Sequence, residues 1–221
     1  MAKVTVIFSG TVPAAVGQDP LRPWREGFSG REDSLEAISV PADHPESLRA
    51  ACQQALEAGS DFLLLADALL RPAPAALDIF LENDVFLRHQ AILVGTVAGP
   101  DGQLLFGGRS RRGRLVQPDP TIPVPCHFFD MSCVLVPAGV FSRFRSPDDL
   151  LRRTFWDFGY GQKVAMAGVP RMVAPGILAR MDHNPLVPLW QDPETSLWRR
   201  VLSYVDSLLR GVLKRIRAML H

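Results

Sequence analysis

Hydrophobic and polar positions follow two different periods along the first two thirds of the chain. Short apolar runs rich in β-branched residues predict strands, and apolar residues at helical spacing predict helices. The predicted strands are Val4–Phe8, Leu35–Val40, Phe62–Leu65, Ala91–Val97 and Cys133–Val136. The predicted helices are Pro45–Ala58, Ala75–Asn83 and Ala138–Phe141. Strands and helices that alternate in this way predict a three-layer α/β sheet, which binds ligands at the carboxyl ends of its strands.

Two segments interrupt this pattern. The Pro/Gly-rich stretch Thr11–Gly30 has no helical period, so we expect a loop. Leu104–Arg114 is rich in glycine and arginine and predicts a hairpin. Ser9, Asp43 and Asp67 each follow a predicted strand closely, and we therefore expect them at one crevice. Asp67 also fits a simpler role, as a turn or helix N-cap residue.

The C-terminal segment differs from the rest of the chain. From Glu194 to Leu220 the apolar residues recur at helical spacing. The opposite face carries Arg199, Arg200, Arg210, Lys214, Arg215 and Arg217. We expect a basic amphipathic helix in residues 191–221, appended to a domain of residues 1–190. Such a helix fits an anionic membrane surface, a homodimer seam or the face of its own domain, and the sequence leaves all three open.

Composition narrows the function classes. The chain has 221 residues, of which 47% are hydrophobic and 21% charged, as in ordinary globular proteins. Its net charge of +1 gives no electrostatic reason to expect nucleic acid binding. Cys52, Cys126 and Cys133 are odd in number and widely spaced, which indicates neither a disulfide framework nor a zinc site. The N-terminus lacks the regions of a signal peptide, and we expect a cytoplasmic protein, placed peripherally on the inner face of the membrane if its tail binds lipid.

The most specific motifs lie in Phe155–Asn184. They read F-W-D-F-G-Y-G at Phe155–Gly161, A-G at Ala167–Gly168, V-A-P-G at Val173–Gly176 and D-H-N at Asp182–Asn184. This order resembles the C-terminal half of the family 2, GT-A type glycosyltransferases, particularly their bacterial rhamnosyltransferase-like branch. In that branch a D-x-D-Y-G element opens a helix, A-G closes it, A-P-G follows, and a His-Asn pair ends the domain.

Two earlier segments resemble the same family. Phe62–Pro72 is similar to the strand that leads into the D-x-D metal motif, with Asp67 as the final acid. Cys126–Pro137 is similar to the segment before the acceptor cleft, and Asp130 stands in its polar half. The resemblance covers roughly Leu35–Asn184.

The resemblance implies a GT-A fold, a nucleotide-diphospho-sugar transferase-like sheet. It also implies metal-dependent transfer of a sugar from a nucleotide-diphosphate donor to a glycan or lipid-linked acceptor, with inversion, in polysaccharide biosynthesis. The implied cofactor is a divalent ion, Mn²⁺ or Mg²⁺. The candidate residues are Asp157 as catalytic base, Asp67 and His183 as metal ligands, Ser9, Asp43 and Arg49 at the nucleotide, and Trp156 and Asp130 at the acceptor.

Other roles remain open for these residues. Asp157 also fits a helix N-cap, and a lone histidine such as His183 is often structural. The basic segment Gly107–Arg114 is either a solvated turn or a site for a diphosphate or an anionic acceptor. Leu65 and Gly159 stand where the family has acids. The alternative function is therefore a non-catalytic GT-A-fold protein that binds a sugar nucleotide or a partner protein. A membrane-surface scaffold built on the tail is a third class.

Overall fold

The computed structural model describes residues 2–10, 19–29, 34–41, 45–143 and 168–182. They belong to one compact unit, Met1–Asp182. The predicted amphipathic tail and the helix expected after Asp157 lie outside the described residues. Within the described ranges, no helix is both long enough and apolar enough to cross a membrane.

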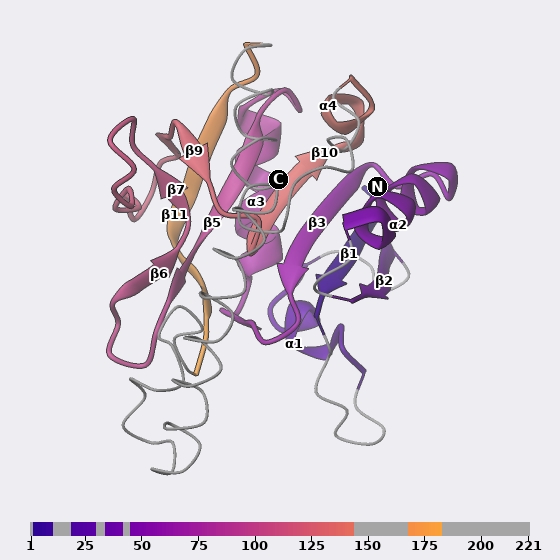
Figure 1. Cartoon of the computed structure of the whole chain (residues 1–221), viewed down its shortest axis with the longest axis horizontal. Helices are drawn as coiled ribbons and strands as arrows, with labels where there is room; N and C mark the ends of the chain where they lie inside the picture. The colour runs from indigo at the N-terminus through magenta and orange to yellow at the C-terminus, as the bar shows by residue number, and fades with distance from the viewer. Residues whose placement is uncertain (1, 11–18, 30–33, 42–44, 144–167, 183–221) are drawn as a thin grey trace, which may run out of the picture. The chain divides into compact units, whose positions relative to one another are not determined.

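A mixed sheet of nine strands forms the middle layer of this unit (Figure 1). Its main path runs β2-β1-β3-β10-β5-β11-β4, with β6 paired to β5 and β8 paired to β11. The bounds along the path are β1 (Val4–Ser9), β2 (Leu35–Val40), β3 (Phe62–Asp67), β4 (Arg71–Pro72), β5 (Ile92–Ala98), β10 (Cys133–Pro137) and β11 (Arg171–Arg180). The side pairs are β6 (Leu104–Phe106) and β8 (Val124–Pro125). β10 runs antiparallel to both β3 and β5, so those two strands point the same way.

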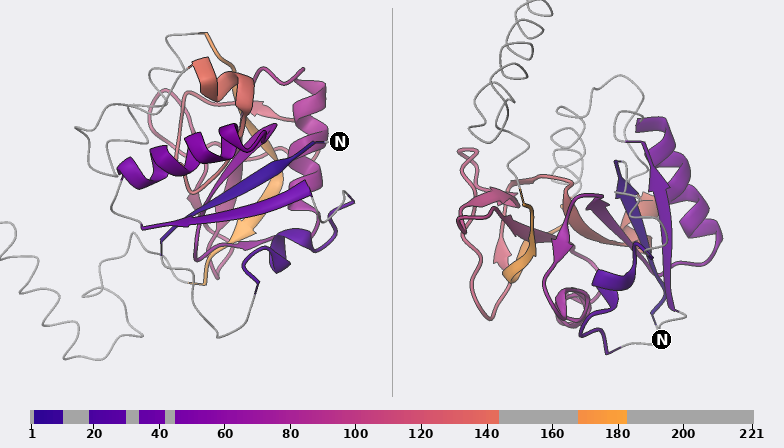
Figure 2. Two further views of the ribbon diagram at one scale, coloured as in Figure 1. Left: turned by 90° about the vertical axis from the view of Figure 1, so that its right-hand side faces the viewer. Right: turned by 90° about the horizontal axis from the view of Figure 1, so that it is seen from below.

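Helices cover both faces of this sheet (Figure 2). They are α1 (Arg22–Arg25), α2 (Pro45–Glu57), α3 (Ala76–Phe86) and α4 (Ala138–Arg143). Residues of α1 and α3 join one hydrophobic core, and residues of α2 and α4 join a second. Successive residues of β3 alternate between them, because side chains on a strand point to opposite faces. Leu64 and Ala66 pack in the α3-side core, whereas Leu63 and Leu65 pack in the α2-side core. The predicted three-layer α/β architecture is therefore confirmed.

The prediction of a loop for Thr11–Gly30 is wrong in part, because α1 lies within it. The helix has only four residues, too few to produce a helical period in the sequence. Proline stands in its first turn, where a missing N–H costs nothing. Trp24 holds it in place, since that side chain is only 3% exposed and packs in the α3-side core. Packing of Trp24 and Leu21 in that core thus anchors this element.

The predicted Gly/Arg-rich hairpin over Leu104–Arg114 also needs correction. Its first part is β6, which pairs with β5 in the large sheet. Its second part is β7 (Gly108–Arg109), which pairs with β9 (Phe128–Phe129) in a separate two-stranded sheet. Gly107, between these two strands, has a φ of +151°, which glycine adopts without strain. The chain passes at this residue from the large sheet to the two-stranded sheet. A tight turn does exist, but it comes later, between Ser110 and Arg114.

Candidate functional site

β1 and β3 end next to each other at the carboxyl edge of the sheet. Ser9 and Asp67 are register partners at the last position of the two strands. The Ala68 N–H donates to the Ser9 carbonyl at 3.1 Å, and the Gly10 N–H donates to the Val40 carbonyl at 2.9 Å. The ends of β2, β1 and β3 are therefore held together by backbone hydrogen bonds. The structure brings two of the candidate residues, Ser9 and Asp67, to one place.

Asp67 is half-buried and its carboxylate is fixed by a turn. Its Oδ1 accepts a hydrogen bond from the Leu69 N–H at 3.0 Å, as in an Asx turn. Its own N–H donates to the Ser132 carbonyl at 2.8 Å. Because Leu63 and Leu65 face α2, strand alternation places the Asp67 side chain on the same face of the sheet. Asp67 therefore has the role of a turn residue. Its carboxylate also lies at the edge where ligands bind in such sheets.

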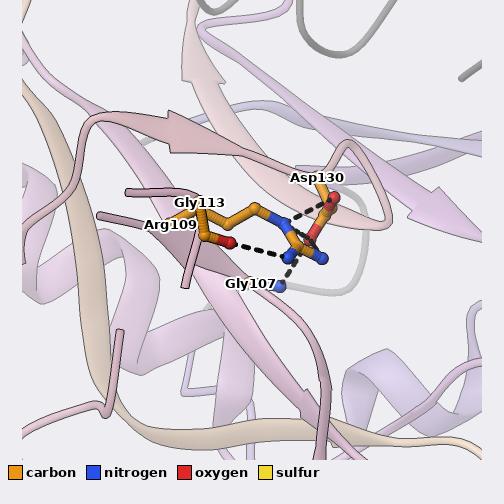
Figure 3. A network of polar contacts seen from close by, with 4 residues as sticks. All are labelled: Gly107, Arg109, Gly113 and Asp130. Carbon is orange, nitrogen blue, oxygen red and sulfur yellow. Dashed lines mark hydrogen bonds and ion pairs between the residues drawn. The ribbon is translucent and has the colours of Figure 1, made fainter. Parts of the chain in front are cut away.

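Asp130 forms a bidentate ion pair with Arg109 (Figure 3). The guanidinium Nε lies 3.3 Å from Oδ1 and 3.1 Å from Oδ2, and Nη2 lies 3.1 Å from Oδ2. The Gly107 N–H donates to Oδ2 at 3.3 Å, and Arg109 Nη1 donates to the Gly113 carbonyl at 3.1 Å. The Arg109 and Asp130 side chains are 30% and 20% exposed, so the pair is partly shielded from solvent. Such bidentate pairs give directional, charge-assisted contacts.

This ion pair lies close to the Asp67 edge. Asp130 is two residues before Ser132, whose carbonyl accepts the Asp67 N–H. Phe129 and Met131, on either side of Asp130, are buried in the α2-side core. The segment that carries Asp130 therefore packs on the face of the sheet to which Asp67 points. Ser9 and Asp67 therefore share one edge, and the segment around Asp130 packs on the same face of the sheet.

The remaining candidate residues do not join this group in the described structure. Arg49 is exposed in the second turn of α2. Asp43, Trp156, Asp157 and His183 lie outside the described residues. No group of three or more histidine, cysteine or acidic side chains suited to a metal occurs in the described ranges. Of the two candidate metal ligands, Asp67 is the one within the described residues, and it provides one hard oxygen ligand of the kind that Mg²⁺ and Mn²⁺ prefer.

The three cysteines are buried and free. Burial raises the pKa of Cys52, Cys126 and Cys133 to about 12 each. A thiol is a nucleophile or metal ligand only as the thiolate. Cys133 packs in the α3-side core, and Cys52 and Cys126 pack in the α2-side core.

The sequence interpretation missed a buried carboxylate away from this edge. Asp84 of α3 is fully buried, and its Oδ2 contacts Nδ1 of His89. Burial raises the pKa of Asp84, while the hydrogen bond and charge of His89 act in the opposite direction. The His89 ring lies 5.9 Å from the ring of Phe62, which is at the opposite end of β3 from Asp67. The Asp84–His89 pair is therefore outside the candidate site. No local pattern in the sequence predicts it.

We expect Gly108→Ala to destabilise the protein by about 1–3 kcal/mol through overpacking. A Cβ at this position would lie 2.3 Å from Cγ2 of Val173 and 2.8 Å from Cβ of Cys126. Both neighbours are buried, so they have little room to move. Chemical denaturation would measure the change in the free energy of unfolding.

Gly139→Ala is the matched control for this prediction. A Cβ there meets nothing within 4 Å, and the residue lies in helix α4, where alanine is favoured over glycine. The control should therefore be neutral or slightly stabilising. Equal stability of the two variants would contradict the tight approach of β7 to β11.

The sequence matches no protein-family model and no curated protein. Solved structures match by shape. A197 from STIV superposes with a TM-score of 0.56 at 12% identity, over 80% of this chain and 84% of A197. S. aureus TarS 1-349 superposes with a TM-score of 0.56 at 11% identity, over 81% of this chain. GalNAc-T7, solved with UDP, GalNAc and Mn²⁺, gives a TM-score of 0.49 at 12% identity, over 82% of this chain.

Two of these structures are longer than the region they share with this chain. The match covers 60% of the TarS fragment and 44% of GalNAc-T7. Identities of 11–12% carry information about the fold alone. The mixed central sheet, its helical layers and the superpositions on A197 and TarS agree, and the chain has a GT-A-like α/β fold.

Proposed function

We propose that this chain is a glycosyltransferase that moves a sugar from a nucleotide-diphosphate donor to a glycan or lipid-linked acceptor, with inversion. The observation that supports it is the position of Asp67 beside Ser9 at the carboxyl edge of a GT-A-like sheet. Open α/β sheets bind ligands at this edge. A carboxylate held there can ligate the divalent ion to which a diphosphate binds.

The proposed donor site uses a divalent ion, Mn²⁺ or Mg²⁺. Asp67 would supply one oxygen ligand, and the donor diphosphate, water and His183 would supply the others. Ser9, Asp43 and Arg49 are the proposed contacts to the nucleotide. The ion would neutralise charge on the departing nucleoside diphosphate.

The proposed acceptor site uses residues from two parts of the chain. Asp157 would take the proton from the attacking hydroxyl, because general-base catalysis needs a carboxylate within hydrogen-bond reach of that group. Trp156 and Asp130 are the proposed contacts to the acceptor. For Asp130, support comes from its position near Asp67 and from the Arg109 ion pair, which fixes its orientation.

A thermal-shift panel of nucleoside diphosphates, with and without Mn²⁺, tests the proposal. Binding to the folded state raises stability by about 2.7 kcal/mol at a ligand concentration a hundred times Kd, which corresponds to a Tm increase of about 5–10 °C for a chain of this size. We expect that increase for at least one nucleoside diphosphate with Mn²⁺ and not with EDTA. Sugar derivatives of the stabilising nucleotide should then be tested as donors in a turnover assay.

Two results would count against the proposal. Stabilisation by a nucleotide without Mn²⁺, and without turnover of any donor, would favour a non-catalytic sugar-nucleotide-binding protein. No stabilisation by any nucleoside diphosphate would remove the donor site altogether.

A further inference from the structure

The turn between Ser110 and Arg114 concentrates positive charge. Arg111, Arg112 and Arg114 are all exposed, and in the part of the chain that the structure describes they form no ion pair. The whole chain has a net charge of only +1, so three cations within four residues, with no ion pair among the described residues, are a local excess. An excess of this kind raises the local concentration of anions.

This turn has a defined conformation. The Ser110 N–H donates to the Arg114 carbonyl at 2.8 Å, and the Gly113 N–H donates to the Ser110 carbonyl at 2.9 Å. Gly113 has a φ of +77°, which favours glycine. At the base of the turn, Arg109 donates to the Gly113 carbonyl and is itself held by Asp130 (Figure 3). The neutralised Arg109 is thus a support, and the other three arginines are presented from a fixed base.

The turn lies away from the level of Asp67. Leu65 of β3 and Val94 of β5 both pair with Val134 of β10, so they lie at the same level of the sheet. Two residues further along each strand, Asp67 and Thr96 also lie at the same level. A Cβ on Gly107 would lie 3.5 Å from the Thr96 Cα, and one on Gly108 would contact Val173, the partner of Val94. β7 therefore leads away from the carboxyl edge before the turn begins. A donor diphosphate at Asp67 is not the natural ligand of these arginines.

We propose that the Ser110–Arg114 turn binds anionic groups of the acceptor, so that the acceptor glycan carries phosphate or carboxylate groups along its length. This inference rests on the proposed function, because it names the class of acceptor. Guanidinium groups fit phosphate and carboxylate oxygens in a bidentate manner, which suits arginine for this contact. An extended chain would reach from this turn to Asp130 on the same face.

The test uses the full chain and long-chain inorganic polyphosphate as the anionic probe, with dextran as the neutral probe. The variant replaces Arg111, Arg112 and Arg114 by serine. The matched control replaces Arg22, Arg88 and Arg180 by serine, since these are also exposed and carry the same three charges. Binding is measured at several salt concentrations.

We expect the turn variant to bind polyphosphate about tenfold or more weakly than the control, with a smaller salt dependence, because it loses its phosphate contacts. Wild-type protein should not bind dextran. Equal loss in both variants, or no preference for polyphosphate over dextran, would overturn the inference. Vesicles of anionic lipid form a further arm, and arginine-dependent binding that favours vesicles over polyphosphate would also overturn it, in favour of a membrane contact.

Nucleotide binding separates this inference from the proposed function. The turn variant should keep the Mn²⁺-dependent Tm increase with nucleoside diphosphate, since the arginines lie away from Asp67. If that increase is lost with the turn, the arginines serve the donor and the acceptor inference is wrong. If wild-type protein lacks the increase but binds polyphosphate through the arginines, the proposed transferase is wrong and the anion site stands.

Discussion

Asp157→Asn should lower the rate of sugar transfer by about 10²–10⁴-fold, the usual contribution of a general base. Asparagine keeps the size of the side chain and its hydrogen-bonding oxygen, but it takes no proton from the acceptor hydroxyl. The nucleotide should bind as before, because the ion and the diphosphate are assigned to other residues. Initial rates with the sugar donor found in the turnover assay would measure the loss in kcat.

The control for this variant is the Mn²⁺-dependent Tm increase with nucleoside diphosphate, which should match that of the wild type. A slow variant with normal nucleotide binding would support the base. Turnover near the wild-type rate would place the base on another residue and reduce Asp157 to a helix cap, the alternative that the sequence also allowed.

Asp67→Asn should weaken Mn²⁺-dependent nucleotide binding by at least about 10–100-fold, the range seen when even an indirect partner of a metal is removed. The amide oxygen of asparagine still accepts the Leu69 N–H, so the turn after β3 is kept while the negative charge is lost. The variant thus separates the metal role from the turn role. Titration of Tm against nucleoside diphosphate, with Mn²⁺ at saturation, gives the change in affinity.

Asp61→Asn is the matched control, since Asp61 directly precedes the first residue of the same strand. Asp61 is exposed, and its Oδ2 accepts the Lys3 N–H at 2.8 Å, a bond that an amide oxygen also accepts. We expect its nucleotide affinity to equal that of the wild type. If Asp67→Asn is also unchanged while Asp67→Ala loses stability, then Asp67 is a turn residue only and the proposed metal site has no support.

The main elements follow from local patterns in the sequence. The predicted Leu35–Val40 coincides with β2, and the predicted Val4–Phe8 and Cys133–Val136 each fall one residue short of the observed strand. The predicted Pro45–Ala58 ends one residue beyond α2, and Gly59 follows with a φ of +80°, as a helix stop requires. These elements bury one face or both, so their residues obey the period of a strand or a helix over several positions. The α/β class therefore follows from local sequence.

The short strands were not predictable in this way. β4, β7, β8 and β9 have two residues each, and two of them contain proline, which weakens any strand signal. A two-residue strand is too short to show a period. It exists because a partner far along the chain offers free backbone groups, as β9 does for β7. The local sequence does not name such a partner.

The sequence alone also placed polar residues at the ends of predicted strands, and parallel packing brings two of them, Ser9 and Asp67, together as expected for such sheets. Only the tertiary structure decided that Asp130 pairs with Arg109, 21 residues away, and that the other arginines of the turn are left without that partner. The physical reason is that an ion pair between distant residues leaves no periodic trace in the sequence. The pairing of β7 with β9 brings Arg109, and not another arginine of this segment, beside Asp130.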